Sequence, residues 1–538
     1  MPSLVTSRQA HQARAIGVEL AMLGRLTRDL PGWLRSPFSL AEAGARVRGG
    51  LAARDRGFLM VVERAIYGSP DSPYLALLRH AGCELGDLRQ LVQAEGLEGA
   101  LQHLAALGVY VTFDEFKGRR VAVRGSARFQ FTQEQFDSPL VSPHWVIFTG
   151  GTRGTPGRVL RWLPLADELA AGIGATFLAH DLADARHIFW LTNPIIQMLN
   201  YLKLGQDTEG WLYPIHPLPF RAQLGAHYFV RMARLNGRRL PMPRFLDMQD
   251  ASRLATWLAG RPRDGRPLAV NTMPSSAVRV AQAAHAAGID LTGVTFHVQS
   301  EPVTDARHQH LTDTGARVLV NYGTIETPTI GYGCAAADRP DDLHVFENRF
   351  ALIERERLVT ERGPSVAAML VTTLTDRGGK ICLNVETGDY GHFERRACTC
   401  LLGALGLTLH LSDVRSFEKL SGEGVTFVRS RLIQVLEEVL PARFGGSTLD
   451  YQLVEEEGTD SSTRIVLRIS PSVGPLDEGA VRATLLAELA SDGVVDRSHA
   501  ALLDRAGSVV ISRELPLATE VGKVLPFHLL RTSTARRP

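Results

Sequence analysis

Hydrophobic and polar positions follow three successive patterns along this chain. Up to residue 110 the apolar positions recur at helical spacing, and the last such run stops at Gly108. From residue 111 to 416, short apolar runs alternate with helical stretches. From residue 417 to 538, a helical stripe precedes strand-like runs and a further helix. The pattern therefore predicts an N-terminal helical portion of a large domain (1–110), an α/β core (111–416) and a small α+β domain (417–538).

The segment 109–131 alternates and is rich in Val, Thr and Phe, which suggests short strands. Further β-rich runs lie at 145–149, 295–298, 318–321 and 369–373, with a helix candidate at 276–287. In the last part we expect helices at 432–440 and 479–489 and strands at 449–454, 465–469 and 509–515. Alternating strands and helices favour a largely parallel sheet in the core. The predicted fold class is α/β, with a large N-terminal α/β domain that has mixed sheets and a small C-terminal α+β domain.

Composition excludes few functions. The chain is 45% hydrophobic and 22% charged, with a net charge of +2, as in ordinary soluble globular proteins. It has no basic patch with interleaved aromatics, so nucleic acid is not indicated. No apolar run approaches the about 20 residues of a membrane span. Five cysteines give no obvious disulfide framework, which makes the cytoplasm the expected location.

The sequence FTGGTRGTPGR at 148–158 is the strongest candidate for chemistry. It follows an apolar run that predicts a buried strand. Glycines allow backbone N–H groups to point at phosphate oxygens, and threonine hydroxyls add donors. The residues expected to contact phosphate are Thr149, Gly150, Gly151, Thr152, Arg153 and Gly154. The Gly-Lys-Ser/Thr ending of a Walker loop is missing, and a glycine-rich surface turn is the alternative.

Four further motifs follow strands or end the chain. In NYGTIET, at 321–327, an aromatic beside a glycine can stack on a base, and Glu326 can hold Mg²⁺. In ETGD, at 386–389, Asp389 can accept hydrogen bonds from ribose hydroxyls. VRSFE carries Arg415, and TEVGK carries Lys523. Taken singly, each is more often a turn, a hairpin or a solvated surface.

Together, in this order and spacing, the motifs resemble those of the adenylate-forming superfamily of acyl-CoA ligases and related enzymes. Residues 149–158 resemble its phosphate loop and 322–326 its Tyr-Gly-x-x-Glu motif. The resemblance implies that Lys523, Glu326 and Arg415 are catalytic, with Lys523 on a mobile C-terminal domain and Arg415 at its hinge. It also implies that the nucleotide contacts Tyr322, Gly323, Thr324, Asp389 and Arg415.

A narrower resemblance comes from LVTTLT at 370–375, the ETGD motif, and the Cys-x-Cys element at 398–400. These resemble the phenylacetate-CoA ligase branch, which includes acyl-protein synthetases. The resemblance covers roughly 140–538. It implies ATP-dependent activation of a small carboxylic acid to an acyl-adenylate, with release of pyrophosphate and with Mg²⁺ as cofactor. The acyl group would then pass to a thiol, most simply that of coenzyme A.

Several alternatives stay open. The acceptor could be a carrier protein, a protein cysteine or an amine instead of coenzyme A, and the chain could form a homodimer. The sequence also departs from the family at Gly150, Arg153 and Ile325, and Phe417 stands where the hinge usually has an aspartate. These departures motivate a third reading, in which the chain is a non-catalytic protein that binds a nucleotide or an acyl metabolite.

Cysteine and histidine spacing suggests a metal site. Cys398 and Cys400 have short ligand spacing, and Cys334 with His344 lies upstream. Some members of the branch that this chain resembles look as though they carry structural Zn²⁺ at comparable positions, and thiolates with an imidazole suit that ion. The alternative is that these cysteines are small buried apolar residues, as we expect for Cys83 and Cys382.

No motif in the sequence marks the residues of the acyl pocket. The resemblance places it between the helix after the phosphate loop and the elements before Glu326. The candidates are Trp190, Asn193, Ile196, Tyr213, His216, His297, Gln299, Ser300, Tyr322 and Gly323. Core packing is the alternative for each aliphatic or aromatic residue among them.

Overall fold

The structure is a computed structural model. It describes residues 2–148, 158–191, 194–214, 220–247, 250–261, 264–358, 365–416, 434–457, 463–489, 509–518, 524 and 527–529. Thr149 to Gly154 and Lys523, all predicted site residues, lie outside these ranges, as do Asn193 and His216.

A sheet of twelve strands organises the large domain, in the order β13-β14-β15-β16-β12-β11-β10-β9-β8-β5-β6-β7. The six strands from β10 to β7 run parallel. They are β10 (Arg317–Tyr322), β9 (Val294–Gln299), β8 (Leu268–Thr272), β5 (Arg186–Trp190), β6 (Thr208–Tyr213) and β7 (Arg244–Phe245). Their near-continuous apolar burial is typical of parallel strands that are covered on both faces.

The other half of this sheet is antiparallel. Its strands are β11 (Gly331–Gly333), β12 (Leu343–Val345), β16 (Leu409–Ser416), β15 (Val385–Arg395), β14 (Ser365–Thr373) and β13 (Phe350–Leu358). The prediction of a largely parallel sheet is therefore wrong for this half, whereas mixed sheets are confirmed. The direction changes at β10, which pairs parallel with β9 and antiparallel with β11. The loop after β10 leaves the sheet at that change.

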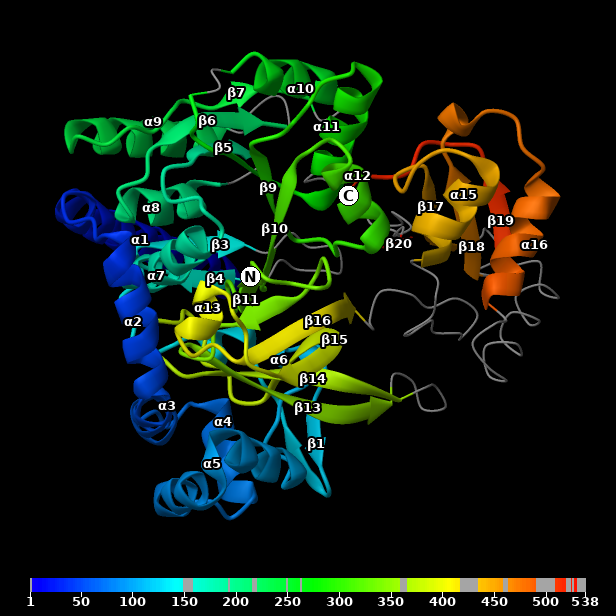
Figure 1. Ribbon diagram of the computed structural model, residues 1–538. Coiled ribbons are helices and arrows are strands. Elements are labelled where there is room, and N and C mark those ends of the chain that lie inside the picture. The colour runs from blue at the N-terminus through cyan, green and yellow to red at the C-terminus, as the bar shows by residue number, and fades with distance from the viewer. Residues whose placement is uncertain are drawn as a thin grey trace.

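Helices cover both faces of the parallel half, and one core cluster runs through them. Figure 1 shows α1, α2, α7 and α8 on one side of these strands and α10, α11 and α12 toward the other. Their bounds are α1 (Pro2–Leu34), α2 (Leu40–Ala52), α7 (Leu163–Ala179), α8 (Ile195–Lys203), α9 (Phe220–Leu235), α10 (Ala251–Ala259), α11 (Pro274–Ala286) and α12 (Asp305–Thr312). Among the described residues, no helix is both long enough and apolar enough to cross a membrane.

A second core lies between the antiparallel half and the remaining N-terminal elements. These are α3 (Arg54–Val61), the π-helical η1 (Val62–Tyr67), α4 (Pro73–His80), α5 (Leu85–Ala106), α6 (Phe113–Phe116), η2 (Gln133–Phe136) and the hairpin β1 (Ala122–Arg124) with β2 (Ala127–Phe129). Another short helix, α13 (Leu401–Ala404), precedes β16. Cys83 and Cys382 are buried in this second core, as predicted.

The hairpin of β3 (Trp145–Phe148) and β4 (Arg158–Arg161) holds the two ends of the glycine-rich loop together. Phe148 pairs with Arg158, so the loop leaves and re-enters the hairpin at neighbouring positions. A Cβ at Gly379 would lie 2.1 Å from the Leu160 carbonyl oxygen. Glycine at 379 therefore lets the chain beside β15 approach the backbone of β4.

The smaller C-terminal domain has its own sheet, in the order β19-β18-β17-β20, and its own core. Its elements are η4 (Val435–Val439), α15 (Leu440–Phe444), β17 (Tyr451–Glu457), β18 (Thr463–Ile469), η5 (Pro471–Val473), α16 (Glu478–Leu489), β19 (Val509–Ser512) and β20 (Phe527–Leu529). These follow the predicted helices and strands closely. The α/β fold class with a small second domain is confirmed (Figure 1).

Candidate functional site

Two sequence motifs meet where β10 ends. The Tyr322 hydroxyl donates to the Asp389 carboxylate at 3.0 Å, although 67 positions separate them. Burial, and then Asp389, raise the pKa of Tyr322, so the phenol keeps its proton and donates. Asp389 and Tyr390 on β15 pair with Ser416 and Arg415 on β16. Tyr322, Asp389 and Arg415, all predicted to contact a nucleotide, therefore lie on adjoining parts of the sheet.

The loop after β10 is held in one shape by threonines. The Thr324 N–H donates to the Thr327 carbonyl at 3.1 Å, and the Thr327 N–H donates to the Thr324 hydroxyl at 3.0 Å. A Cβ at Gly323 would lie 2.4 Å from the Thr329 nitrogen, so the turn requires glycine at this position. This fixed turn presents the Glu326 side chain beside the hairpin of β3 and β4.

Glu326 is a mostly buried carboxylate with a lysine partner. Its Oε1 contacts the Lys117 Nζ, and the two side chains are 15% and 9% exposed. Burial by itself raises the pKa of Glu326, but the Lys117 charge and hydrogen bond lower it, and the net shift is downward. Glu326 is therefore ionised at neutral pH. An ionised carboxylate oxygen is a ligand that suits Mg²⁺.

Glu326 lines a small cleft together with charged and hydroxyl side chains, among them Glu168, Arg349, Thr373, Thr375 and Lys380. Arg349 lies 3.6 Å from Glu168. Burial raises the pKa of Glu168 even though Arg349 opposes that rise.

Two cations, Arg349 and Lys380, and two carboxylates, Glu168 and Glu326, line this cleft. Lys117, Arg158 and Arg161 lie beside this lining, and so does Asp137. Asp137 joins two of the cations, at 2.9 Å from Arg158 and 2.7 Å from Lys380. Arg161 donates to the Ile325 carbonyl, next to Glu326. The cations beside the lining can attract an anion to this cleft.

Arg415 stands at the end of β16, the last described element before the C-terminal domain. Its guanidinium lies 3.7 Å from Asp341 and 3.9 Å from Asp413. Phe417 and Glu418, the rest of the predicted hinge, lie outside the described residues. From the C-terminal domain, Glu437 on η4 reaches the large domain, 3.1 Å from the Arg307 Nε on α12.

The cysteine and histidine candidates form one cluster. The ligand atoms of Cys334, His344, Cys398 and Cys400 all lie within 4.8 Å of one another. Cys334 Sγ is 3.4 Å from Cys398 Sγ and 4.0 Å from Cys400 Sγ, and Cys400 Sγ is 3.0 Å from His344 Nε2. Cys334 directly follows β11, and His344 lies on β12, which pairs with both β11 and β16. Cys398 and Cys400 lie in the segment between β15 and α13.

The protonation of this cluster suits a metal. His344 Nδ1 lies 2.9 Å from the Leu407 carbonyl, which fixes the proton there and leaves the Nε2 lone pair facing Cys400. The hydrogen bond from Cys334 lowers the pKa of Cys400 far below its ordinary value. The same hydrogen bond, and burial, raise the pKa of Cys334. Three thiols and one imidazole nitrogen match the donor set of closed tetrahedral zinc sites.

The predicted acyl-pocket residues divide into two groups. Trp190 donates to the Leu246 carbonyl at 3.1 Å and belongs to the core cluster, and His297 is also buried, which agrees with the alternative of core packing. Nearer the strand ends, Gln299 Oε1 accepts from Gln197 at 2.9 Å and from Asn321 at 3.2 Å. This amide cluster joins α8, β9 and β10 beside Tyr322 and is the better candidate for substrate contact.

Sequence reasoning missed Lys117 and Arg161. Lys117 lies 209 positions before its partner Glu326, in a part of the chain that no motif marked. The signal for Arg161 was its place directly after the glycine-rich loop, where a cation can face phosphate.

Comparisons with known proteins give likenesses of fold only. No protein-family model and no curated protein matches the chain. A 2-hydroxyisobutyryl-CoA ligase, solved with 2-HIB-AMP and CoA in the thioesterification state, is 15% identical over 94% of this chain and 90% of its own, with a TM-score of 0.43. ATP-bound MatB from Rhodopseudomonas palustris is 13% identical over 80% of this chain and 71% of its own, with a TM-score of 0.42. The amide bond synthetase McbA from Marinactinospora thermotolerans is 14% identical over 90% and 98%, with a TM-score of 0.42.

Because these identities and TM-scores are low, the function has to be inferred from the chain's own residues.

Proposed function

We propose that this protein activates a small carboxylic acid with ATP, forming an acyl-adenylate and pyrophosphate, and then transfers the acyl group to a thiol. The observation that carries the proposal is the meeting of Tyr322 with Asp389 at the end of β10. This contact brings together two motifs that resemble base-binding and ribose-binding elements. Their junction lies next to Glu326 and to a cleft whose lining includes Arg349 and Lys380.

Each group has a role that its chemistry supports. The Tyr322 ring would stack on the adenine, and the Asp389 carboxylate would accept from the ribose hydroxyls. The cations at the cleft and the loop at 149–154 would hold the β- and γ-phosphates, so that pyrophosphate leaves from a neutralised site. Glu326 and the Thr324 hydroxyl would hold Mg²⁺, which supplies further charge neutralisation when bound.

The carboxylate oxygen of the acid attacks the α-phosphorus, and the bond from that phosphorus to the pyrophosphate oxygen breaks. This brings two anions together, so a cation has to lie between them. We assign that cation to Lys523 on the C-terminal domain. The thiol step would follow after the domain turns about a hinge at Arg415.

Coenzyme A is the acceptor that we propose first. A carrier protein, a protein cysteine or an amine would use the same adenylate and differ only in the second step. A non-catalytic binding protein is the remaining candidate, favoured by Gly150, Arg153 and Ile325, which replace the residues usual in the resembled motifs.

We also propose that Cys334, His344, Cys398 and Cys400 hold one structural Zn²⁺. A site with four protein ligands has no open position, so the metal would stabilise the chain between β11, β12 and β16 and take no part in the reaction.

Carboxylate-dependent exchange of labelled pyrophosphate into ATP tests the proposed activity. A panel of aryl, fatty and amino acids should contain at least one that supports exchange. If ATP binds but no acid supports exchange, the proposed adenylating activity is wrong, and the non-catalytic binding protein becomes the better account.

A further inference from the structure

We propose that Lys117 is the resident counter-cation of Glu326, which a divalent cation displaces when it arrives with the nucleotide. Lys117 would thereby suppress metal binding in the absence of ATP. The proposal rests on the nucleotide site assigned above, and it adds a positioning residue that no motif contains.

The contact between Lys117 and Glu326 joins two largely dehydrated charges. The lysine is 9% and the glutamate 15% exposed. The Lys117 Nζ also lies 5.5 Å from the Phe113 ring and 5.8 Å from the Phe116 ring, so its surroundings are partly aromatic. A carboxylate this buried needs a positive partner, because an unpaired charge in such surroundings is costly. In the structure as it stands, Lys117 is that partner.

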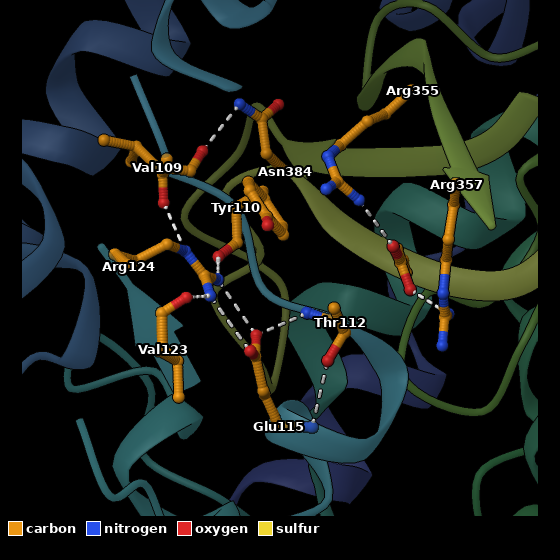
Figure 2. A network of polar contacts seen from close by, with 11 residues as sticks. Val109, Tyr110, Thr112, Glu115, Val123, Arg124, Arg355, Arg357 and Asn384 are labelled. Carbon is orange, nitrogen blue, oxygen red and sulfur yellow. Dashed lines mark hydrogen bonds and ion pairs between the residues drawn. The ribbon is translucent and has the colours of Figure 1, made fainter. Parts of the chain in front are cut away.

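The backbone that carries Lys117 is held rigidly. Lys117 directly follows α6, whose Thr112 N–H donates to the Glu115 carboxylate at 2.8 Å. Arg124 binds both oxygens of the same carboxylate at 3.0 Å, and it donates to the Gly108 carbonyl at 2.8 Å. Figure 2 shows this network around Arg124, Glu115 and Thr112.

The same network ties α6 to the strand that carries the ribose-binding candidate. The Asn384 amide donates to the Val109 carbonyl at 3.1 Å, as Figure 2 shows, and the Glu386 N–H donates to the Val111 carbonyl at 2.9 Å. The anchor of Lys117 is thus fixed relative to Asp389, three positions after Glu386. The lysine side chain, with its flexible four-carbon stem, is the part that can move.

Displacement follows from charge balance at Glu326. Mg²⁺ sites in nucleotide enzymes use one or two carboxylates plus substrate phosphates. A bare cation would have to expel the ammonium from Glu326 without bringing another anion for it. A cation that arrives with a polyphosphate brings an anion to which the Lys117 ammonium can turn. The pair therefore favours joint entry of metal and nucleotide over entry of metal alone.

A purely structural ion pair would behave differently. It would stabilise the link between α6 and the loop after β10, and its loss would lower stability without creating a metal site. The two roles are separated by the metal affinity of the nucleotide-free protein.

The test measures Mn²⁺ binding to the full chain without nucleotide, by electron paramagnetic resonance of the free ion. The variant Lys117→Met removes the charge and keeps the length of the side chain. It should bind one Mn²⁺ about tenfold or more tightly than the wild type, because one close cation no longer competes. Adding Glu326→Gln to Lys117→Met should abolish the gain.

Lys203→Met is the matched control. Lys203 is also mostly buried in an ion pair, 3.4 Å from Asp167, but it lies on α8 beside α1. Its loss should leave Mn²⁺ affinity unchanged. Lys117→Gln repeats the test with a side chain that can still donate to Glu326, in case the methionine variant does not fold.

Unchanged Mn²⁺ affinity in a folded Lys117→Met or Lys117→Gln variant would overturn the proposal. A gain that persists after Glu326→Gln would overturn it too, because the ion would then bind elsewhere. The assay needs no acid and no turnover. A negative result here therefore leaves adenylation open, and a negative exchange assay leaves the competition at Glu326 open.

Discussion

Replacing Asp389 with asparagine removes one negative charge from the strand end where Tyr322 meets it and keeps the shape of the side chain. The Tyr322 hydroxyl, which donates to Asp389 at 3.0 Å, can still donate to the amide oxygen of the variant. The fold should therefore survive, and any change in ATP affinity should report the ribose contact.

The size of the effect follows from the bond that is lost. A hydrogen bond to a charged group contributes about 1.5–3 kcal/mol, and about 1.4 kcal/mol is tenfold in affinity, so Asp389→Asn should weaken ATP binding by about 10- to 150-fold. Binding of the bare carboxylic acid should hardly change, because Asp389 is assigned to the ribose.

Calorimetric titration of the nucleotide-free protein measures this loss. The control is Asp181→Asn, at an exposed turn after α7 where the backbone has φ 57°, which asparagine tolerates. Wild-type protein should lose a similar amount when ATP is replaced by its 2′-deoxy or 3′-deoxy analogue, and Asp389→Asn should lose much less on that replacement. Equal ATP affinity in wild type and Asp389→Asn would refute the assignment of Asp389 to the nucleotide.

Three further predictions concern the metal, the mobile domain and acid stability. Tag-free protein should contain about one zinc per chain by elemental analysis, and Cys398→Ser with Cys400→Ser should remove it and lower the melting temperature; zinc content that this change leaves intact would contradict the site. Lys523→Ala should slow adenylate formation about a hundredfold or more, yet convert a synthetic acyl-adenylate to thioester at nearly the wild-type rate; equal damage to both steps would contradict its role. Burial lowers the pKa of His187 to about 3, so the unfolded chain takes up a proton there first as pH falls below about 6.5, and stability is lost. His187→Phe should reduce the loss between pH 7 and pH 5 by about 2 kcal/mol in denaturant titrations, and an unchanged pH dependence would contradict the buried neutral state.

Much of the fold could be predicted because its signals are local. The strand expected at 318–321 is β10 (Arg317–Tyr322), and the helix expected at 276–287 is α11 (Pro274–Ala286). The antiparallel half was harder to predict. Its short strands β11 (Gly331–Gly333) and β12 (Leu343–Val345) contain too few positions to show alternation, and the direction in which the longer strands pair is not a local signal. Their partners are chosen by contacts between distant segments.

The residues of the candidate site also differ in how well the sequence predicts them. Tyr322, Glu326 and Asp389 lie in short motifs whose residue types indicate what they can bind. The structure brings Tyr322 and Asp389 into contact. Lys117 stands in no motif, and its contact with Glu326 exists only because α6 packs beside β15. A residue that reaches the site only through tertiary packing has no recognisable motif around it in the sequence.

Transfer of oxygen from the acid to AMP tests the central claim most directly. If the carboxylate attacks the α-phosphorus of ATP, an acid labelled with ¹⁸O in its carboxyl group should leave one labelled oxygen in the phosphate of AMP after thioester formation. Mass spectrometry of the nucleotide products measures this. Labelled AMP with unlabelled pyrophosphate is the result that the account predicts, and label in inorganic phosphate with ADP as the nucleotide product would contradict it.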